Sequence, residues 1–165
     1  MRHLLLLRHA KSSWANPELP DFDRPLNKRG QRSAKALGRW LHSNGTLPEL
    51  VYCSSARRTR ETWDGLKLPG EVAFRDDLYE ADSGAVLDVV RACPTPSLLV
   101  IGHNPGLADL AHSLARTAPA HARWSDYPTG ALTSLRFEVS AWADLVPGTG
   151  TVEAFLTPHD LAPTA

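Results

Sequence analysis

His3-Leu4-Leu5-Leu6-Leu7-Arg8-His9 is an apolar run that is too short for a helix and that ends on two basic side chains. A run of this kind is typical of a strand that is buried on both faces of a sheet. A second such run, Leu98-Leu99-Val100-Ile101, is followed by Gly102-His103. Short buried strands separated by helical patterns indicate an α/β protein with a mostly parallel sheet.

The rest of the chain alternates between extended and helical patterns in the same way. We expect strands at 3–7, 50–53, 71–75, 98–101, 132–138 and 151–156, and helices at 32–42, 56–66, 85–92 and 105–115. This order predicts a three-layer, doubly wound sheet with helices on both faces and room for one antiparallel strand near the edge. We expect residues 1–165 to form one domain whose Pro-rich tail, from about residue 158, is frayed.

Composition argues against several classes of partner. The 165 residues carry 18 Lys and Arg against 18 Asp and Glu, so no overall charge favours nucleic acid or a membrane surface. The leucine run stops at Arg8, and no stretch approaches the roughly 20 apolar residues of a membrane span. Cys53 and Cys93 lack a metal-type spacing, and we expect both to be reduced, buried thiols. These features favour a cytoplasmic protein.

Polar clusters follow three of the predicted strands. They are Arg8 to Trp14, Ser54 to Thr62 and Gly102 to Gly106. Because the carboxyl ends of parallel strands share one edge of a sheet, we expect these side chains to meet in one crevice. Two histidines and several arginines make an anion pocket there, and a guanidinium binds phosphate oxygens in a bidentate fork. Phosphate is therefore the expected ligand.

The same residues resemble the histidine phosphatase (phosphoglycerate mutase-like) superfamily. Four elements occur in family order: Arg8-His9 like the Arg-His-Gly signature, Asp23-Arg24-Pro25-Leu26 to Gly30 like the Pro-Leu-x-x-x-Gly element, Ser54-Ser55 with Arg58 and Thr62, and Gly102-His103. The short chain and the motif Arg-His-Ala-Lys-Ser-Ser-Trp are most similar to the compact phosphohistidine phosphatase branch. Ala10 departs from the family's usual glycine, and Ala15 from the asparagine of the mutases.

The resemblance implies a catalytic centre of His9, Arg8, Arg58 and His103. His9 would attack phosphorus and form a covalent phosphohistidine, with its other ring nitrogen donating to a backbone carbonyl. Arg8, Arg58 and His103 would stabilise the transferring group, and further phosphate-binding candidates are Ser12, Lys11 and Asn104. The candidate general acid is Glu80, with Asp82 in reserve; compact members need not keep this acid, so neither residue is required.

The implied substrate is a phosphohistidine protein or a phosphorylated small molecule, and no metal or other cofactor is expected. One alternative is a phosphate-binding or inactive relative, although binding alone does not need a nucleophile. Another is a zinc hydrolase using His3, His9 and His103, which lack a spaced ligand motif. Simpler roles also exist: Ser54 and Ser55 are candidate helix caps, and Arg57 and Arg60 candidate surface charges. The segment 128–130 is a candidate loop at the site.

Overall fold

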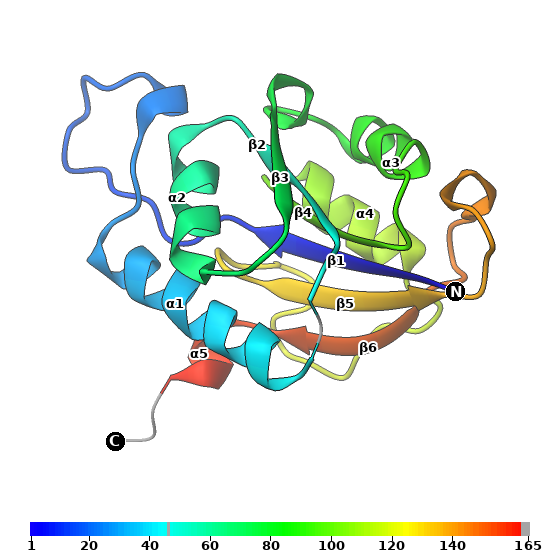
Figure 1. The fold of residues 1–165 in the computed structure, drawn as a ribbon. Helices are drawn as coiled ribbons and strands as arrows, with labels where there is room; N and C mark the ends of the chain where they lie inside the picture. Colours follow the sequence, from blue (N-terminus) through cyan, green and yellow to red (C-terminus); the bar gives the residue numbers. More distant parts are fainter. Residues whose placement is uncertain (46, 163–165) are drawn as a thin grey trace.

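The computed structural model describes residues 1–45 and 47–162, which build one six-stranded sheet flanked by helices (Figure 1). The strands are β1 (Arg2–Arg8), β2 (Leu50–Ser54), β3 (Glu71–Arg75), β4 (Ser97–Gly102), β5 (Leu132–Phe137) and β6 (Thr151–Leu156). The helices are α1 (Lys28–Ser43), α2 (Arg57–Leu66), α3 (Ser83–Arg91), α4 (Gly106–Leu114) and α5 (Pro158–Leu161), with 3-10 turns at Asp21–Asp23, Asp76–Leu78 and Trp142–Asp144. None of the helices in these described ranges is long and apolar enough to cross a bilayer.

The strands run in the order β3-β2-β4-β1-β5-β6. Strands β3, β2, β4 and β1 are parallel to one another, β5 is antiparallel to β1, and β6 is antiparallel to β5. The predicted α/β fold with a mostly parallel sheet is confirmed, and its antiparallel strand is β5, one place in from the edge. Strands β1, β2 and β4 therefore end at the same edge, which brings their polar followers together.

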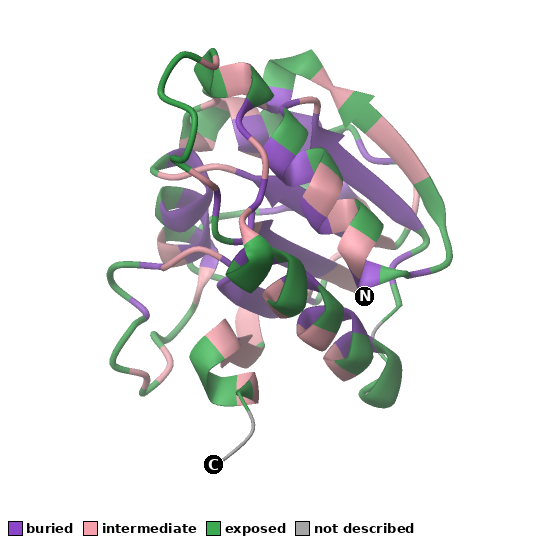
Figure 2. Cartoon of the chain, turned by 90° about the vertical axis from the view of Figure 1, so that its left-hand side faces the viewer, coloured by how far each residue is buried: buried purple, intermediate pink, exposed green. Residues whose placement is uncertain are grey.

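Each central strand contributes to two apolar cores because successive side chains point to opposite faces of a sheet. Leu4 and Leu6 pack with α3 and α4, whereas Leu5 and Leu7 pack with α1 and α2. Figure 2 shows these buried strands between the exposed faces of the helices. Cys53 and Cys93 are buried free thiols, as expected, and they belong to different cores, so they do not meet.

Helices α1 and α3 start earlier than predicted because side-chain caps, rather than apolar periodicity, define their first residues. Helix α1 begins at Lys28 instead of residue 32, where the Asn27 side chain accepts a hydrogen bond from the Gly30 amide at 2.8 Å. Helix α3 begins at Ser83 after a similar cap by Asp82. Helix α4 begins at Gly106, one residue later than predicted.

The prediction of a frayed tail from about residue 158 is wrong for its first four residues. Pro158–Leu161 form α5, which opens with a reciprocal cap between Thr157 and Asp160. Leu161 packs against the core beside α1. The short helix therefore covers one side of α1, while residues 163–165 lie outside the described part of the chain.

Candidate active site

The imidazole of His9 lies just past the end of β1. Its backbone amide donates to the Gly102 carbonyl at the end of β4 at 3.1 Å, and the residue is only 6% exposed. The ring atom Nδ1 lies 2.7 Å from the Ala10 carbonyl oxygen. A carbonyl can only accept, so Nδ1 carries the proton and donates, as the sequence led us to expect. The other ring nitrogen, Nε2, keeps its lone pair.

The turn that carries His9 is tied to helix α2. The buried amide of Ala10 donates to the Thr62 hydroxyl at 3.0 Å, and that hydroxyl donates to the Arg58 carbonyl at 2.7 Å. Ala10 does not adopt a positive φ, so the alanine fits where the family's signature has glycine. One buried threonine therefore joins the turn of His9 to the helix that presents Arg58.

The imidazole of His103 follows β4 and lies beside His9, with ring centroids 5.4 Å apart. Its Nδ1 lies 3.4 Å from Arg58 Nη2, and its Nε2 lies 2.8 Å from the Ser54 hydroxyl oxygen. A guanidinium can only donate, so Nδ1 accepts and Nε2–H donates to Ser54. Three strand ends, those of β1, β2 and β4, thus meet at this pair of rings.

Burial and neighbouring cations keep both rings neutral. Burial lowers the pKa of His9 to about 3, and His103, Arg58 and Arg8 act in the same direction against the hydrogen bond to Ala10. Burial, and then the charge of Arg58, lower the pKa of His103 to about 4. At neutral pH the Nε2 lone pair of His9 is therefore free of a proton.

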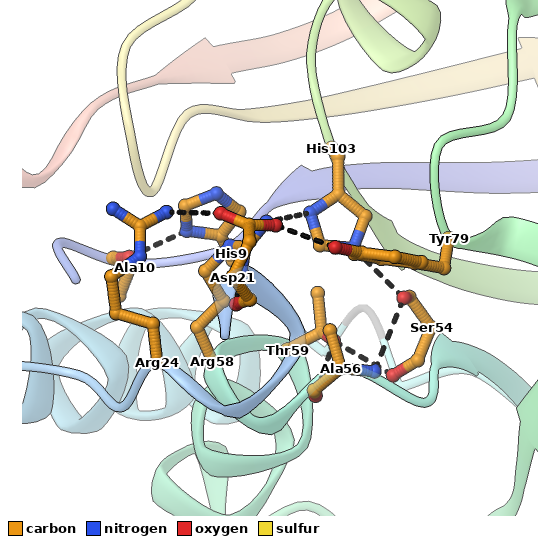
Figure 3. Close-up of polar contacts among 10 residues, drawn as sticks. All are labelled: His9, Ala10, Asp21, Arg24, Ser54, Ala56, Arg58, Thr59, Tyr79 and His103. Atoms are coloured by element: carbon orange, nitrogen blue, oxygen red, sulfur yellow. Dashed lines mark hydrogen bonds and ion pairs between the residues drawn. The ribbon is translucent and has the colours of Figure 1, made fainter. Parts of the chain in front are cut away.

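Asp21 lies at the site although the sequence did not reveal it (Figure 3). Its carboxylate accepts hydrogen bonds from Arg58 Nη2 at 3.0 Å, Arg24 Nη2 at 3.0 Å and the Tyr79 hydroxyl at 2.6 Å. Its backbone carbonyl accepts from Arg58 Nη1 at 2.7 Å. The Tyr79 hydroxyl, and then Arg58, lower the pKa of Asp21, so this carboxylate is ionised and holds Arg58 beside His103.

Arg8 is held by a loop from the last third of the chain. Its Nη1 donates to the Tyr127 carbonyl at 3.1 Å, and Asn104 Nδ2 donates to the same oxygen at 2.8 Å. The Gly130 amide donates to the carbonyls of Arg8 at 3.1 Å and His9 at 2.9 Å. The segment 128–130 thus lies at the site, as expected, and burial beside Arg58 lowers the pKa of Arg8.

The other phosphate-binding candidates have different surroundings. Ser12 is buried and forms an isolated antiparallel bridge with Leu26. Lys11 is exposed and lines a hollow next to Arg8. Asn104 uses one amide hydrogen on Tyr127 and keeps its buried carbonyl oxygen without a partner among the described residues. Arg57 and Arg60 are exposed, as predicted for surface charges.

Neither general-acid candidate is joined to the histidines. Glu80 is exposed with a φ of 58°, and no hydrogen bond or ion pair within 1–45 and 47–162 links it to His9, Arg58 or His103. Asp82 uses its carboxylate to cap α3 through the Ala85 amide at 2.9 Å. The resemblance proposed these two residues from their position in the sequence. In the structure Glu80 is exposed to solvent and Asp82 caps α3.

The zinc alternative is wrong in its ligand set. His3 is the second residue of β1 and His9 follows its end, so about 20 Å of extended chain separates them at roughly 3.3 Å per residue. His3 Nε2 instead lies 3.1 Å from Glu153 Oε1. His3, His9 and His103 therefore cannot share one ion.

Comparisons with known proteins identify the family and the fold of this chain. Residues 4–89 match the family model of the histidine phosphatase superfamily (branch 1). An uncharacterised protein of Mycobacterium tuberculosis is 33% identical over 160 residues, covering 93% of this chain and 100% of the relative. An inferred phosphohistidine phosphatase, SixA, from Nakamurella multipartitia has a TM-score of 0.83 at 31% identity, covering 95% of this chain and 96% of the other. A protein histidine phosphatase SixA complexed with tungstate shares the fold, with a TM-score of 0.78 at 23% identity, covering 97% and 99% of the two chains.

Proposed function

This chain belongs to the histidine phosphatase superfamily, and from that premise we propose that it hydrolyses phosphohistidine or small phosphomonoesters through a covalent intermediate on His9. The hydrogen bond from His9 Nδ1 to the Ala10 carbonyl carries the proposal. It fixes the tautomer that leaves Nε2 unprotonated, among Arg8, Arg58 and His103. A neutral imidazole held in this way is an activated nucleophile.

The reaction has two steps. In the first, the Nε2 lone pair attacks phosphorus, the bond from phosphorus to the leaving oxygen or nitrogen breaks, and the leaving atom takes a proton from solvent water. In the second, a water oxygen attacks phosphorus, the phosphorus–nitrogen bond to His9 breaks, and inorganic phosphate leaves while water gives up its proton. His9 thus returns to its neutral form at the end of each cycle.

The cations around His9 stabilise the charge on the transferring group. Arg58 is held in place by Asp21 and Arg8 by the Tyr127 carbonyl, so both guanidinium groups are oriented before the substrate arrives. Fixed donors of this kind cost no reorganisation at the moment of reaction. The neutral His103 adds no positive charge, and it helps to place Arg58, whose Nη2 donates to its Nδ1.

The leaving group favours phosphohistidine among the candidate substrates. An alkoxide needs a proton from a general acid, and within the described residues the exposed Glu80 makes no hydrogen bond or ion pair with His9, Arg58 or His103. An imidazole leaving group is less demanding because its ring nitrogens take up a proton near neutral pH. The likeness to proteins named SixA supports the same substrate class. We propose that this activity is cytoplasmic, because both cysteines are free thiols and thiols stay reduced in that compartment.

The first test is release of phosphate from p-nitrophenyl phosphate in the presence of EDTA, followed by a phosphohistidine peptide. We expect steady turnover by the wild type and none by His9→Ala. The matched control is His42→Ala, because His42 is an exposed histidine on α1 away from the site. Brief exposure to a radiolabelled substrate should leave an acid-labile, alkali-stable phosphoryl group on the wild type and none on His9→Ala.

Other outcomes decide between the alternatives. Loss of activity in EDTA would favour a metal-dependent hydrolase, and equal turnover by His9→Ala would remove the nucleophile from the proposal. Phosphate binding by a folded wild type that turns over neither substrate would support the binding-protein alternative.

A further inference from the structure

Helix α1 carries a cluster of basic side chains and no acidic ones, although the chain as a whole has no net charge. Its sequence has five basic side chains and no acidic one: Lys28, Arg29, Arg32, Lys35 and Arg39. All five are exposed. None of them takes part in an ion pair with another residue of 1–45 or 47–162. The charge of this face is therefore available to a partner.

The position of these charges on the helix makes the field stronger. Lys28 and Arg29 lie in the first turn of α1, where the helix dipole is already positive and where no acidic side chain offsets it. Arg29, Arg32 and Arg39 recur at spacings that place them on one side of the helix. Like charges at these spacings repel one another, so the folded chain gains nothing from them, and an anion bound there would relieve the repulsion.

The basic face lines a concave path that begins at the active site. One hollow of about 370 Å³ is lined by Arg8, Lys11, Arg29 and Arg123. Arg123 is paired there with Asp126 at 2.8 Å. A second hollow of about 430 Å³ is lined by Arg29, Arg32, Lys35 and Arg39 together with Ala36, Pro158 and Leu161. The two hollows share Arg29, Ser33, Pro158 and His159, and together we name them the α1 trough.

The shape of the α1 trough fits an extended chain better than a small molecule. From Arg29 to Arg39 the helix rises about 15 Å at roughly 1.5 Å per residue. An extended peptide covers that length with about four or five residues, at roughly 3.3 Å each. The cations of the lining match acidic side chains, and its apolar residues Ala36, Pro158 and Leu161 match apolar side chains between them.

We propose that the α1 trough binds an acidic segment of a phosphorylated protein substrate while the phosphoryl group of that protein lies at His9. This inference rests on the proposed function and narrows its substrate to proteins with acidic residues near the phosphorylated side chain. Arg8 belongs to both the trough and the active site, because it lines the trough and immediately precedes His9 in the chain. The segment next to the phosphorylated residue therefore enters the trough at Arg8 and runs along α1 past Arg39.

The test uses two phosphohistidine peptides that differ only in flanking glutamates or glutamines. The trough variant is Arg32→Gln/Lys35→Gln/Arg39→Gln, which leaves every candidate active-site residue in place. The control variant, Arg60→Gln/Lys67→Gln/Arg116→Gln, removes the same charge from exposed positions outside the trough. We expect the wild type to prefer the acidic peptide in kcat/KM by on the order of tenfold, which several exposed ion pairs together supply. The trough variant should lose this preference, and the control variant should keep it.

Two further measurements separate this proposal from the phosphatase itself. Turnover of p-nitrophenyl phosphate should be unchanged in both triple variants. Fluorescence anisotropy of the unphosphorylated acidic peptide should show binding to the wild type that is lost in the trough variant. The binding should also weaken at about 1 M salt, where the Debye length is about 3 Å.

Equal kcat/KM for the two peptides in the wild type would overturn the proposal. So would an equal loss of the preference for the acidic peptide in the trough variant and in the control variant. A single-stranded oligonucleotide that binds as tightly as the acidic peptide would overturn it in favour of a general polyanion surface. If the wild type turned over no substrate, the proposed function would fail, and the anisotropy measurement alone would decide whether the trough binds acidic peptides.

Discussion

Arg58 and Asp21 contact each other at two points, although 37 residues separate them in the sequence. Arg58 Nη1 donates to the Asp21 carbonyl oxygen at 2.7 Å, and Nη2 donates to the Asp21 carboxylate at 3.0 Å. The arginine is buried, whereas the Asp21 side chain is half exposed. The loop before α1 thus fixes a cation that belongs to α2, and it does so beside both histidines.

Asp21→Asn should lower kcat about tenfold, which corresponds to a loss of about 1.4 kcal/mol in the transition state. The asparagine cannot attract Arg58 with a full charge, so the guanidinium is less well oriented toward the transferring group. Tyr79→Phe is the matched control, because it removes one bond to Asp21 and leaves Arg58 in contact, so its effect should be smaller. An unchanged kcat in Asp21→Asn would show that Arg58 does not depend on this contact.

The two site histidines should stay neutral well below the ordinary pKa of an imidazole. Since the pKa of His9 is lowered to about 3 and that of His103 to about 4, their ring NMR signals should not titrate between pH 7 and pH 5. A midpoint near 6.5 for either ring would contradict the burial argument. Direct observation of the rings avoids confusion with the phosphate substrate, whose second ionisation lies near pH 6.

The same shifts make the folded state less stable in acid. An unfolded histidine takes up a proton below about pH 6.5, whereas the folded His9 and His103 remain neutral until about 3 and 4. The free energy of unfolding should therefore fall as pH is lowered from 7 toward 4. Each histidine contributes up to about 1.4 kcal/mol per pH unit. Urea titrations at several pH values should show a shallower dependence in His9→Gln than in the wild type.

Thr62→Val should destabilise the protein by about 1–3 kcal/mol, because it leaves the buried Ala10 amide without an acceptor. The turn that carries His9 would also lose its attachment to α2, so kcat should fall as well. Thr62→Ser keeps the hydroxyl and should restore both quantities. If the valine variant matched the wild type in urea unfolding, the bond would not contribute to the folded state.

Gly30→Ala should cost about 1–3 kcal/mol, because an added Cβ would lie 2.1 Å from the Lys11 carbonyl oxygen. The matched control is Gly84→Ala in helix α3, where the nearest atom is 3.5 Å away. That change should stabilise the protein by about 0.4–1 kcal/mol, since alanine restricts the unfolded chain. Thermal unfolding of the two variants should shift in opposite directions.

Glu80→Gln should leave the rate on a phosphohistidine peptide within about twofold of the wild type, a change of less than about 0.5 kcal/mol. The carboxylate is exposed and makes no hydrogen bond or ion pair with His9, Arg58 or His103 within the described chain. A rate loss of a hundredfold or more would restore Glu80 as the general acid.

The sequence by itself determined the order of the elements and the edge of the sheet at which the site lies. Continuous apolar runs such as residues 4–7 and 98–101 can only be buried on both faces, and this requirement predicts central parallel strands. The polar residues after such strands are then placed at one edge without further information. Arg8, His9 and His103 could therefore be predicted as neighbours, whereas the choice of Arg58 among the nearby arginines depended on the resemblance to the family motif.

Only the tertiary structure decided how these side chains are held. The contacts of Asp21 with Arg58, of Tyr127 with Arg8 and of Thr62 with Ala10 join residues from distant loops and helices. No local pattern marks such partners, because a loop carboxylate or carbonyl looks the same in sequence whether it faces solvent or an arginine. The start of α1 and the helix α5 depended likewise on caps by Asn27 and Thr157. Hydrophobic periodicity fixes which residues are buried, but the pairing of polar groups depends on distances that exist only after the chain has folded.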